Sequence, residues 1–209
     1  MLATIGRIPD SAPDNYKQLH IYAKENPNPR QLNKFIDLCN TQQDTHGIPF
    51  EIDYRNNVGQ TALWVACFLG NEQTAKILVR NGADVNARAN DNSTPMHACI
   101  GSSKCSIKLM TYLIHDCGGN YRFSDKQGRD PVEWLKDELS YRKSKSMWFN
   151  GSRKILQDKL TYLEKIGNEH RRRLIINDSN WRKNLDFDLE GIVQYKRGNR
   201  GDSIGGLEK

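Results

Sequence analysis

The residues of this chain best suited to chemistry are two histidines and three cysteines between positions 97 and 117. They are His97, Cys99, Cys105, His115 and Cys117, and imidazole and thiolate groups are the usual protein ligands of zinc. Their spacings, His-x-Cys followed by Cys-x5-Cys, match none of the common zinc patterns. The alternative is that His97 makes a local hydrogen bond and Cys99 fills a core position. We therefore expect no metal and no cofactor.

No segment has the spacing of a catalytic site either. Gly118-Gly119 is not followed by Lys-Ser/Thr, so it does not form a phosphate-binding loop. The carboxylates of residues 1–139 are scattered over predicted helix faces and turns, where a charge is usually solvated and does not act as an acid or base. The sequence indicates a protein that is not an enzyme.

Composition points to a protein of the cytoplasm or nucleus. No apolar run approaches the roughly 18 residues of a membrane span, and the first ten residues, MLATIGRIPD, lack the apolar core of a signal peptide. The five cysteines are odd in number and irregularly spaced. This spacing argues against a disulfide framework, so we expect reduced thiols in the core.

A repeated segment organises the chain. Residues 57–87 contain a glycine-bearing turn, an expected helix over 61–69, a second over 72–81 and a stop at Gly82. Thr61, Leu63 and Trp64 return as Thr94, Met96 and His97, 33 residues later. A 33-residue period with a Thr-Pro-Leu-His-like start is typical of ankyrin repeats. The predicted fold is an all-α ankyrin-repeat solenoid of about four repeats, with degenerate terminal repeats, a C-terminal helix and a disordered basic tail.

The expected domain boundaries follow from this register. Residues 1–13 contain two prolines and no periodic pattern, and we expect a flexible lead-in. Residues 14–167 form the repeat domain, with a polar linker at 140–146 and a closing helix at 152–166. Its repeats are expected at 14–54, 55–87, 88–123 and 124–167. Residues 168–209 are expected to be a basic, largely disordered tail.

Charge is unevenly placed along the chain. Residues 1–139 carry 15 Lys+Arg against 16 Asp+Glu, whereas residues 140–209 carry 16 against 9. Basic clusters beside an aromatic residue suit a phosphate backbone, but they also suit nuclear import, an acidic partner or an inert solvated tail. The candidate residues of this basic tail are Arg171, Arg172, Arg173, Trp181, Arg182 and Lys183.

The turns and inner helices of stacked repeats form an exposed edge and a concave face. Arginines at matching positions of three successive turns, with aromatic residues beside them, suit an acidic and partly apolar peptide. Tyr54 and Phe123 have an alternative role, because both occupy an alanine-like position and would then brace the turns. The candidate partner-binding residues are Tyr54, Arg55, Asn56, Trp64, Phe68, Leu69, Arg88, Asn90, Arg122 and Phe123.

Three motifs resemble one group of ankyrin proteins more closely than the others. Residues 56–66 (NNVGQTALWVA), 91–98 (DNSTPMHA) and 117–119 with 125–129 (CGG and DKQGR) are similar to the amino-terminal repeats of the testis-expressed ankyrin–pseudokinase scaffold family of germ-cell intercellular bridges. The likeness covers about residues 19–134. It implies a scaffold whose kinase-like domain lacks ordinary activity. The present sequence ends at Lys209 without a kinase motif, so no catalytic residue carries over, and we expect only the ankyrin part or a short relative.

The sequence thus favours a non-catalytic interaction module that binds another protein, has no membrane segment and is a monomer. Two alternatives stay open. One is the targeting region of a pseudokinase scaffold at intercellular bridges or the midbody. The other is an adaptor that binds nucleic acid through the basic tail, which we expect to be the weaker reading of that tail.

Overall fold

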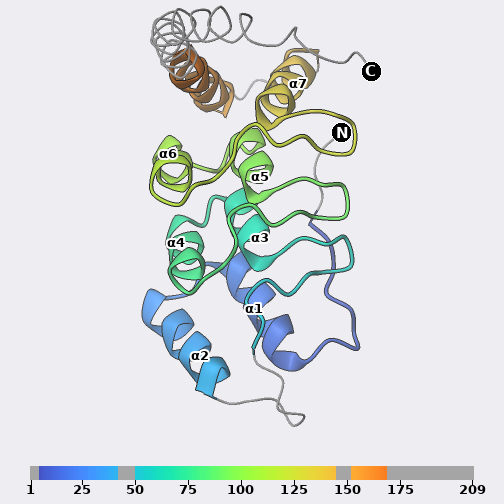
Figure 1. Cartoon of the computed structure of the whole chain (residues 1–209), viewed down its shortest axis with the longest axis vertical. Coiled ribbons are helices and arrows are strands. Elements are labelled where there is room, and N and C mark those ends of the chain that lie inside the picture. Colours follow the sequence, from blue (N-terminus) through green and yellow to red (C-terminus); the bar gives the residue numbers. More distant parts are fainter. Residues whose placement is uncertain (1–4, 42–49, 145–151, 169–209) are drawn as a thin grey trace, which may run out of the picture. The chain divides into compact units, whose positions relative to one another are not determined.

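The computed structural model describes residues 5–41, 50–144 and 152–168, and the regular elements in these residues are helices, with no strand. The chain divides into two compact units, Met1–Tyr162 and Leu163–Lys209, and the arrangement below is that of the first unit. Figure 1 shows its elements. They are α1 (Asp14–Glu25), α2 (Pro29–Thr41), α3 (Ala62–Leu69), α4 (Glu72–Arg80), α5 (Pro95–Gly101), α6 (Ile107–His115) and α7 (Pro131–Ser144), followed by a helix over residues 152–168.

The labelled helices form two rows (Figure 1). In the inner row α1 packs on α3, α3 on α5 and α5 on α7, while α4 packs on α3 and α6 on α5 to form the outer row with α2. Each element therefore contacts its neighbours along the stack, which is the arrangement of a repeat protein. The all-α repeat solenoid expected from the 33-residue period is confirmed.

The two rows differ in burial because the inner helices are covered by a helix pair on either side. Residues 62–67 of α3 and residues 95–100 of α5 are buried without interruption. In α4 the buried side chains Ala75 and Leu78 lie on one face, and exposed Gln73 lies on another. An apolar segment with no polar face thus marks an inner helix, and an amphipathic one marks an outer helix.

Local capping sets where the inner helices begin. The Thr61 side chain accepts a hydrogen bond from the Trp64 amide at 3.2 Å. In the next repeat Thr94 and His97 form a reciprocal capping box, followed by Pro95 in the first turn. Gly70 ends α3 with φ of 74°, a left-handed conformation that glycine adopts at little cost. The starts predicted from the sequence at Thr61 and Thr94 agree with these caps.

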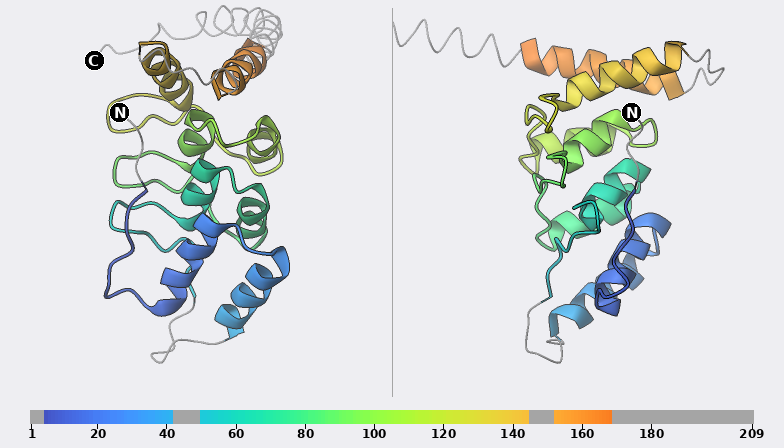
Figure 2. Two further views of the ribbon diagram at one scale, coloured as in Figure 1. Left: turned by 180° about the vertical axis from the view of Figure 1, so that it is seen from behind. Right: turned by 90° about the vertical axis from the view of Figure 1, so that its right-hand side faces the viewer.

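Tight turns before the inner helices form a ladder along one side of the stack, visible as projecting loops in Figure 2. We call residues 56–60, 89–93 and 125–129 the finger turns. The Asn90 amide donates to the Val58 carbonyl at 3.0 Å, and the Lys126 amide donates to the Asp91 carbonyl at 2.8 Å. The same register therefore links each finger turn to the next.

The amino-terminal segment joins this ladder. The Gly6 amide donates to Gln60 Oε1 at 2.9 Å, and the Asn57 amide donates to the Arg7 carbonyl at 2.9 Å. A Cβ on residue 6 would lie 2.4 Å from Val58 Cγ2, so the contact is close. From residue 5 onward the expected flexible lead-in is thus held against the second repeat. No periodic pattern could reveal this, because the contacts are made by the backbone.

Helix α7 extends into the expected polar linker. It runs to Ser144, whereas the sequence suggested that a linker begins at residue 140. A polar composition does not end a helix when charges pair along it, and Arg142 Nε donates to Glu138 Oε1 one turn earlier at 2.7 Å. The helix over 152–168 overlaps the predicted closing helix at 152–166. In the part of the chain with described coordinates, no helix is long and apolar enough to span a membrane.

The cysteines correct one expectation. Cys99 and Cys105 are joined as a disulfide, with their Cα atoms 5.4 Å apart, whereas Cys39, Cys67 and Cys117 are free thiols. Irregular spacing excluded a conventional disulfide framework but carried no information about this pair. The two residues meet because a loop returns Cys105 to the end of α5.

Candidate functional site

A cavity of about 220 Å³ opens on the inner row between α3, α5 and α7. We call it the groove. Its lining combines aromatic side chains, the loop after α5 and charged residues of the fourth repeat. The lining residues are Phe68, His97, Ala98, Gly101, Ser102, Ser103, Lys104, Arg129, Trp134, Asp137, Glu138, Tyr141 and Arg142.

The groove exists because one repeat lacks a side chain where its neighbour has a large one. Gly101 stands 33 residues after Phe68, at the corresponding position of the next inner helix. A Cβ at Gly101 would lie 3.4 Å from Trp134 Cε3, and no larger group fills the space. Phe68 is held in place by stacking on Trp64, with ring centroids 5.4 Å apart. The result is a hollow with aromatic walls.

His97 supports the wall beside Trp134. Its Nδ1 accepts a hydrogen bond from the Thr94 amide at 3.1 Å, and its Nε2 lies 3.2 Å from the Arg129 carbonyl. Burial lowers the pKa of His97, so the neutral ring accepts at Nδ1 and donates from Nε2. Its ring meets that of Trp134 edge-on at 5.2 Å. The local hydrogen bond considered from the sequence is therefore present.

Most charges around the groove are paired within it. Arg129 lies 2.8 Å from Asp125 and 3.2 Å from Asp137. Burial of Asp125 opposes its ionisation, but hydrogen bonds from Trp134 and Arg129 hold its pKa below the usual value. Arg142 pairs with Glu138. Among the described residues the exposed Lys104 ammonium has no carboxylate within ion-pair distance. Lys104 is thus the groove cation left to meet an incoming anion.

A second exposed feature is the row of arginines at the finger turns. Arg55, Arg88 and Arg122 are all exposed, as the sequence suggested. The Arg88 guanidinium lies 4.6 Å from the centre of the Phe123 ring, which belongs to the next repeat. Tyr54 is half-buried and stacks on Tyr16 at 4.1 Å. The two aromatic residues therefore brace the turns, which was the alternative role considered for them.

Two expected surface residues lie in the interior instead. Trp64 is 1% exposed, and its indole N–H donates to Ser93 Oγ at 3.2 Å. Asn56 is 5% exposed, and its Oδ1 accepts from the Val58 and Gln60 amides. Both shape the stack from within, because a residue at the tip or on an inner helix is covered by the following repeat. Of the remaining candidates, Phe68 and Leu69 are half-buried and Asn90 is exposed.

The other candidate residues separate. His115 Nε2 lies 2.9 Å from the Tyr162 hydroxyl, and Cys99 bonds to Cys105. No group of three or more His, Cys, Asp or Glu residues is arranged to hold a metal ion in the ranges 5–41, 50–144 and 152–168. The six basic-tail residues at positions 171–173 and 181–183 lie outside the described residues.

Sequence reasoning missed several groove residues, including Lys104, Trp134 and Tyr141. One signal was available. The register of 33 residues aligns the small Gly101 with the large Phe68, so a missing side chain on the inner face could have been noticed. The contribution of Trp134 could not, because it depends on how the degenerate fourth repeat packs.

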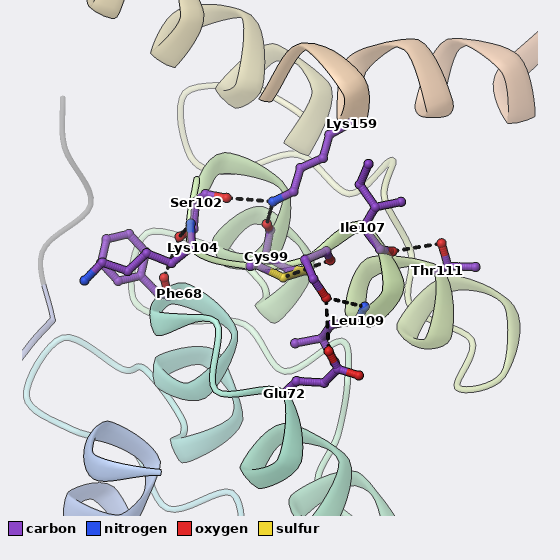
Figure 3. The surroundings of a disulfide bond; sticks show 11 residues. Phe68, Glu72, Cys99, Ser102, Lys104, Ile107, Leu109, Thr111 and Lys159 are labelled. Carbon is purple, nitrogen blue, oxygen red and sulfur yellow. Dashed lines mark hydrogen bonds between the residues drawn. A yellow bond between two sulfur atoms is a disulfide. The ribbon is translucent and has the colours of Figure 1, made fainter. Parts of the chain in front are cut away.

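Behind the groove lies a buried amine. Lys159 is 0% exposed, and its Nζ donates to the Cys99 and Ser102 carbonyls at 2.7 and 2.6 Å, as Figure 3 shows. Burial lowers the pKa of Lys159 to about 7 and raises that of the nearby Cys67 thiol to about 12. A neutral amine has two N–H groups, which these two carbonyls satisfy. Lys159 therefore acts as a clamp on the carboxyl end of α5.

Comparisons with known proteins agree with this architecture. A family model described as ankyrin repeats (3 copies) matches residues 19–125, just over half of the chain. Residues of the chain are also 32% identical over 71 positions to the NF-kappa-B inhibitor cactus of Drosophila melanogaster, covering 34% of this chain and 14% of that protein.

Two further relatives are inactive kinases. The chain is 42% identical over 83 residues to the inactive serine/threonine-protein kinase TEX14 of Bos taurus, covering 40% of this chain. It is 37% identical over 121 residues to TEX14 of Mus musculus, covering 56% of this chain. The matches span only 5% and 7% of those relatives, so the likeness concerns a small part of each.

Proposed function

Because this chain belongs to the ankyrin-repeat family, whose stacked repeats present extended binding surfaces, we propose that it is a non-catalytic module that captures an extended acidic segment of another protein. The groove receives an apolar side chain of that segment. The exposed cations receive its carboxylates.

The single observation that carries this proposal is the groove itself. Phe68 and Trp134 offer apolar walls, while Gly101 leaves the space between them unfilled. A buried aromatic or aliphatic anchor in such a pocket supplies much of the affinity of a protein interface. Lys104 stands at the rim with no carboxylate of its own, so an acidic residue beside the anchor completes the pairing.

The finger arginines extend this preference along the stack. Arg55 and Arg88 are exposed at equivalent positions of successive repeats. Guanidinium groups bind carboxylates through two parallel hydrogen bonds, which adds geometric specificity. A segment that follows the turns would meet one arginine per repeat. We therefore expect the partner segment to carry several spaced acidic residues.

A peptide library displayed on phage tests the proposal with the full chain as bait. We expect recovered peptides to combine an aromatic or large aliphatic residue with acidic neighbours. Lys104→Glu should weaken binding of a recovered peptide by about tenfold, which corresponds to about 1.4 kcal/mol. Lys34→Glu, the same change on the exposed surface of α2, is the matched control and should leave binding unchanged.

The double change Arg55→Glu with Arg88→Glu should abolish capture while the thermal midpoint stays nearly constant, because exposed substitutions usually alter stability by less than about 0.5 kcal/mol. Recovery of basic peptides, or of none, would refute the proposal. Phosphoryl transfer from ATP by the purified chain would refute its non-catalytic part.

The similarity to the two TEX14 proteins favours a narrower second candidate. In this reading the repeats are the targeting region of an inactive-kinase scaffold in the cytoplasm, with a role at intercellular bridges or midbodies during cell division. Localisation of the tagged chain in dividing germ-line cells tests it. A diffuse distribution in these cells would count against it.

The basic tail supports a third reading, an adaptor for nucleic acid. Binding of RNA or DNA would then weaken steeply with added salt, because phosphate contacts release counterions. It would also be lost on deleting residues 168–209. Protein capture that persists after this deletion would assign the function to the repeats.

A further inference from the structure

We infer that the Cys99–Cys105 disulfide regulates the groove, so that a partner binds tightly when the two sulfurs are bonded and weakly when they are reduced. This inference rests on the function proposed above, because it concerns the same groove.

The disulfide closes a loop that forms one wall of the groove. We call residues 101–105 the groove loop. Gly101, Ser102, Ser103 and Lys104 all line the cavity, and the bond ties Cys105 back to α5. The sulfur–sulfur bond therefore connects the two ends of the segment whose middle faces the partner. Figure 3 shows Ser102 and Lys104 beside this bond.

The two ends of the groove loop are held differently. At the first end, Ser102 Oγ donates to the Phe68 carbonyl at 2.6 Å, and the Ser102 carbonyl accepts from Lys159 Nζ at 2.6 Å. At the second end, the Lys104 amide donates to Ser102 Oγ at 3.1 Å, and the covalent tie is at Cys105. Reduction leaves the bonds of Ser102 in place and removes the tie at the second end.

The freed end is the one that carries charge into the groove. Lys104 follows directly before Cys105 in the chain. Ser103 Oγ accepts a hydrogen bond from Arg142 at 3.4 Å across the groove, a long contact that adds little restraint. A loop that must be ordered again when the partner binds costs conformational entropy, whereas a closed loop is already ordered. The oxidised form is therefore the stronger binder.

The redox step balances with a small thiol such as glutathione. One thiolate attacks a sulfur of the pair, breaks the S–S bond and forms a mixed disulfide, and a second thiolate displaces it. Two electrons and two protons pass to Cys99 and Cys105, and glutathione disulfide leaves. The reverse exchange restores the bond. Cys67 does not interfere, because burial raises the pKa of its thiol to about 12 and keeps it protonated.

Burial of the pair links reduction to partner binding. Both cysteines are 0% exposed, so a thiol reaches them only when the groove loop opens. A partner seated in the groove holds the loop closed and opposes reduction. By linkage, the factor by which oxidation strengthens partner binding is also the factor by which the partner shifts the disulfide toward the oxidised form.

The test uses the full chain and a peptide recovered from the library described above. The chain is equilibrated in buffers of different glutathione to glutathione disulfide ratio, its disulfide content is measured by thiol alkylation and mass spectrometry, and peptide affinity is measured by fluorescence anisotropy. We expect the reduced chain to bind at least about fivefold more weakly, which is the lower range of allosteric coupling.

Two variants fix the reduced condition. Cys99→Ala places alanine where Ala66 stands in the preceding repeat, so the substitution has a precedent in this fold. Cys105→Ser removes the other sulfur. Both should bind like the reduced chain and cease to respond to glutathione. Cys117→Ser, a free half-buried thiol outside the groove loop, is the control and should keep the response.

The outcomes separate this inference from the proposed function. Peptides that bind the oxidised and reduced chains equally would overturn the inference alone. A chain that never forms the Cys99–Cys105 bond at any glutathione ratio would also overturn it. If no peptide is recovered in either redox state, the proposed function fails and takes the inference with it. If one variant does not fold, the comparison of the oxidised and reduced natural chain still decides.

Discussion

Gly101 has its effect through the side chain it lacks. Phe68 occupies the corresponding position one repeat earlier, and a large residue at 101 would extend toward Trp134. The groove therefore depends on one small residue in an otherwise regular inner helix.

Replacing Gly101 by leucine should close the groove. We expect a recovered peptide to bind at least about tenfold more weakly, a loss of about 1.4 kcal/mol. Gly101→Ala is the matched control. It adds only a Cβ at 3.4 Å from Trp134, and by its better helix propensity it should stabilise the fold by about 0.5 kcal/mol with affinity unchanged. Isothermal titration and thermal unfolding measure the two effects. Equal affinity of the leucine variant would place the binding site elsewhere.

Lys159 makes stability depend on pH. Burial lowers its pKa in the folded chain from 10.5 to about 7, so between these values the unfolded chain holds a proton that the folded chain has released. The free energy of unfolding should therefore rise with pH across that window. Urea titrations at several pH values between 7 and 9 measure the slope.

The variant Lys159→Met should lose this contribution to the slope, because it has no amine to titrate. Lys154→Met, an exposed change on the same helix, should retain it. A slope that is identical in all three chains would mean that Lys159 is solvated.

At the scale of elements, the finger turns are joined by the backbone. The amino-terminal segment adds to their ladder through Gly6 and the Arg7 carbonyl. Because these contacts need a close approach of two main chains, the size of residue 6 matters and the identity of residue 7 does not.

Gly6→Val should detach the segment, since even a Cβ would lie 2.4 Å from Val58 Cγ2. We expect faster hydrogen exchange at the Asn57 amide and a lower thermal midpoint. Arg7→Ala should change neither, because Arg7 accepts through its carbonyl and its side chain is exposed. Unchanged exchange in Gly6→Val would show that the segment contributes no protection.

At the scale of the whole first unit, stability is passed between neighbouring repeats. Leu78 in α4 and Leu32 in α2 are both 0% exposed, but α4 contacts helices of two repeats, whereas α2 lies in the terminal pair. In a stack whose repeats contact only their neighbours, a central defect reaches further than a terminal one.

Each leucine-to-alanine change should cost about 2–5 kcal/mol at its own site. Leu78→Ala should reduce hydrogen-exchange protection throughout the first unit, whereas Leu32→Ala should reduce it mainly in α1 and α2. Hydrogen exchange with mass spectrometry resolves the two patterns. A uniform loss in both variants would indicate a single cooperative unit.

Local periodicity was sufficient to predict the repeats. The 33-residue register, the caps at Thr61 and Thr94 and the stops at glycine depend on neighbouring residues, so the sequence alone determined the all-α stack and the starts of its inner helices. It also identified the exposed finger arginines, because their positions follow from the same register.

Tertiary structure decided what the register does not contain. Trp64 and Asn56 turned inward because the next repeat covers them, and Gly6 found its place through backbone contacts that carry no side-chain pattern. The Cys99–Cys105 bond and the Lys159 clamp join residues brought together by a loop and by a distant helix. The groove depends on packing between successive repeats, so its shape could be seen only after the chain had folded.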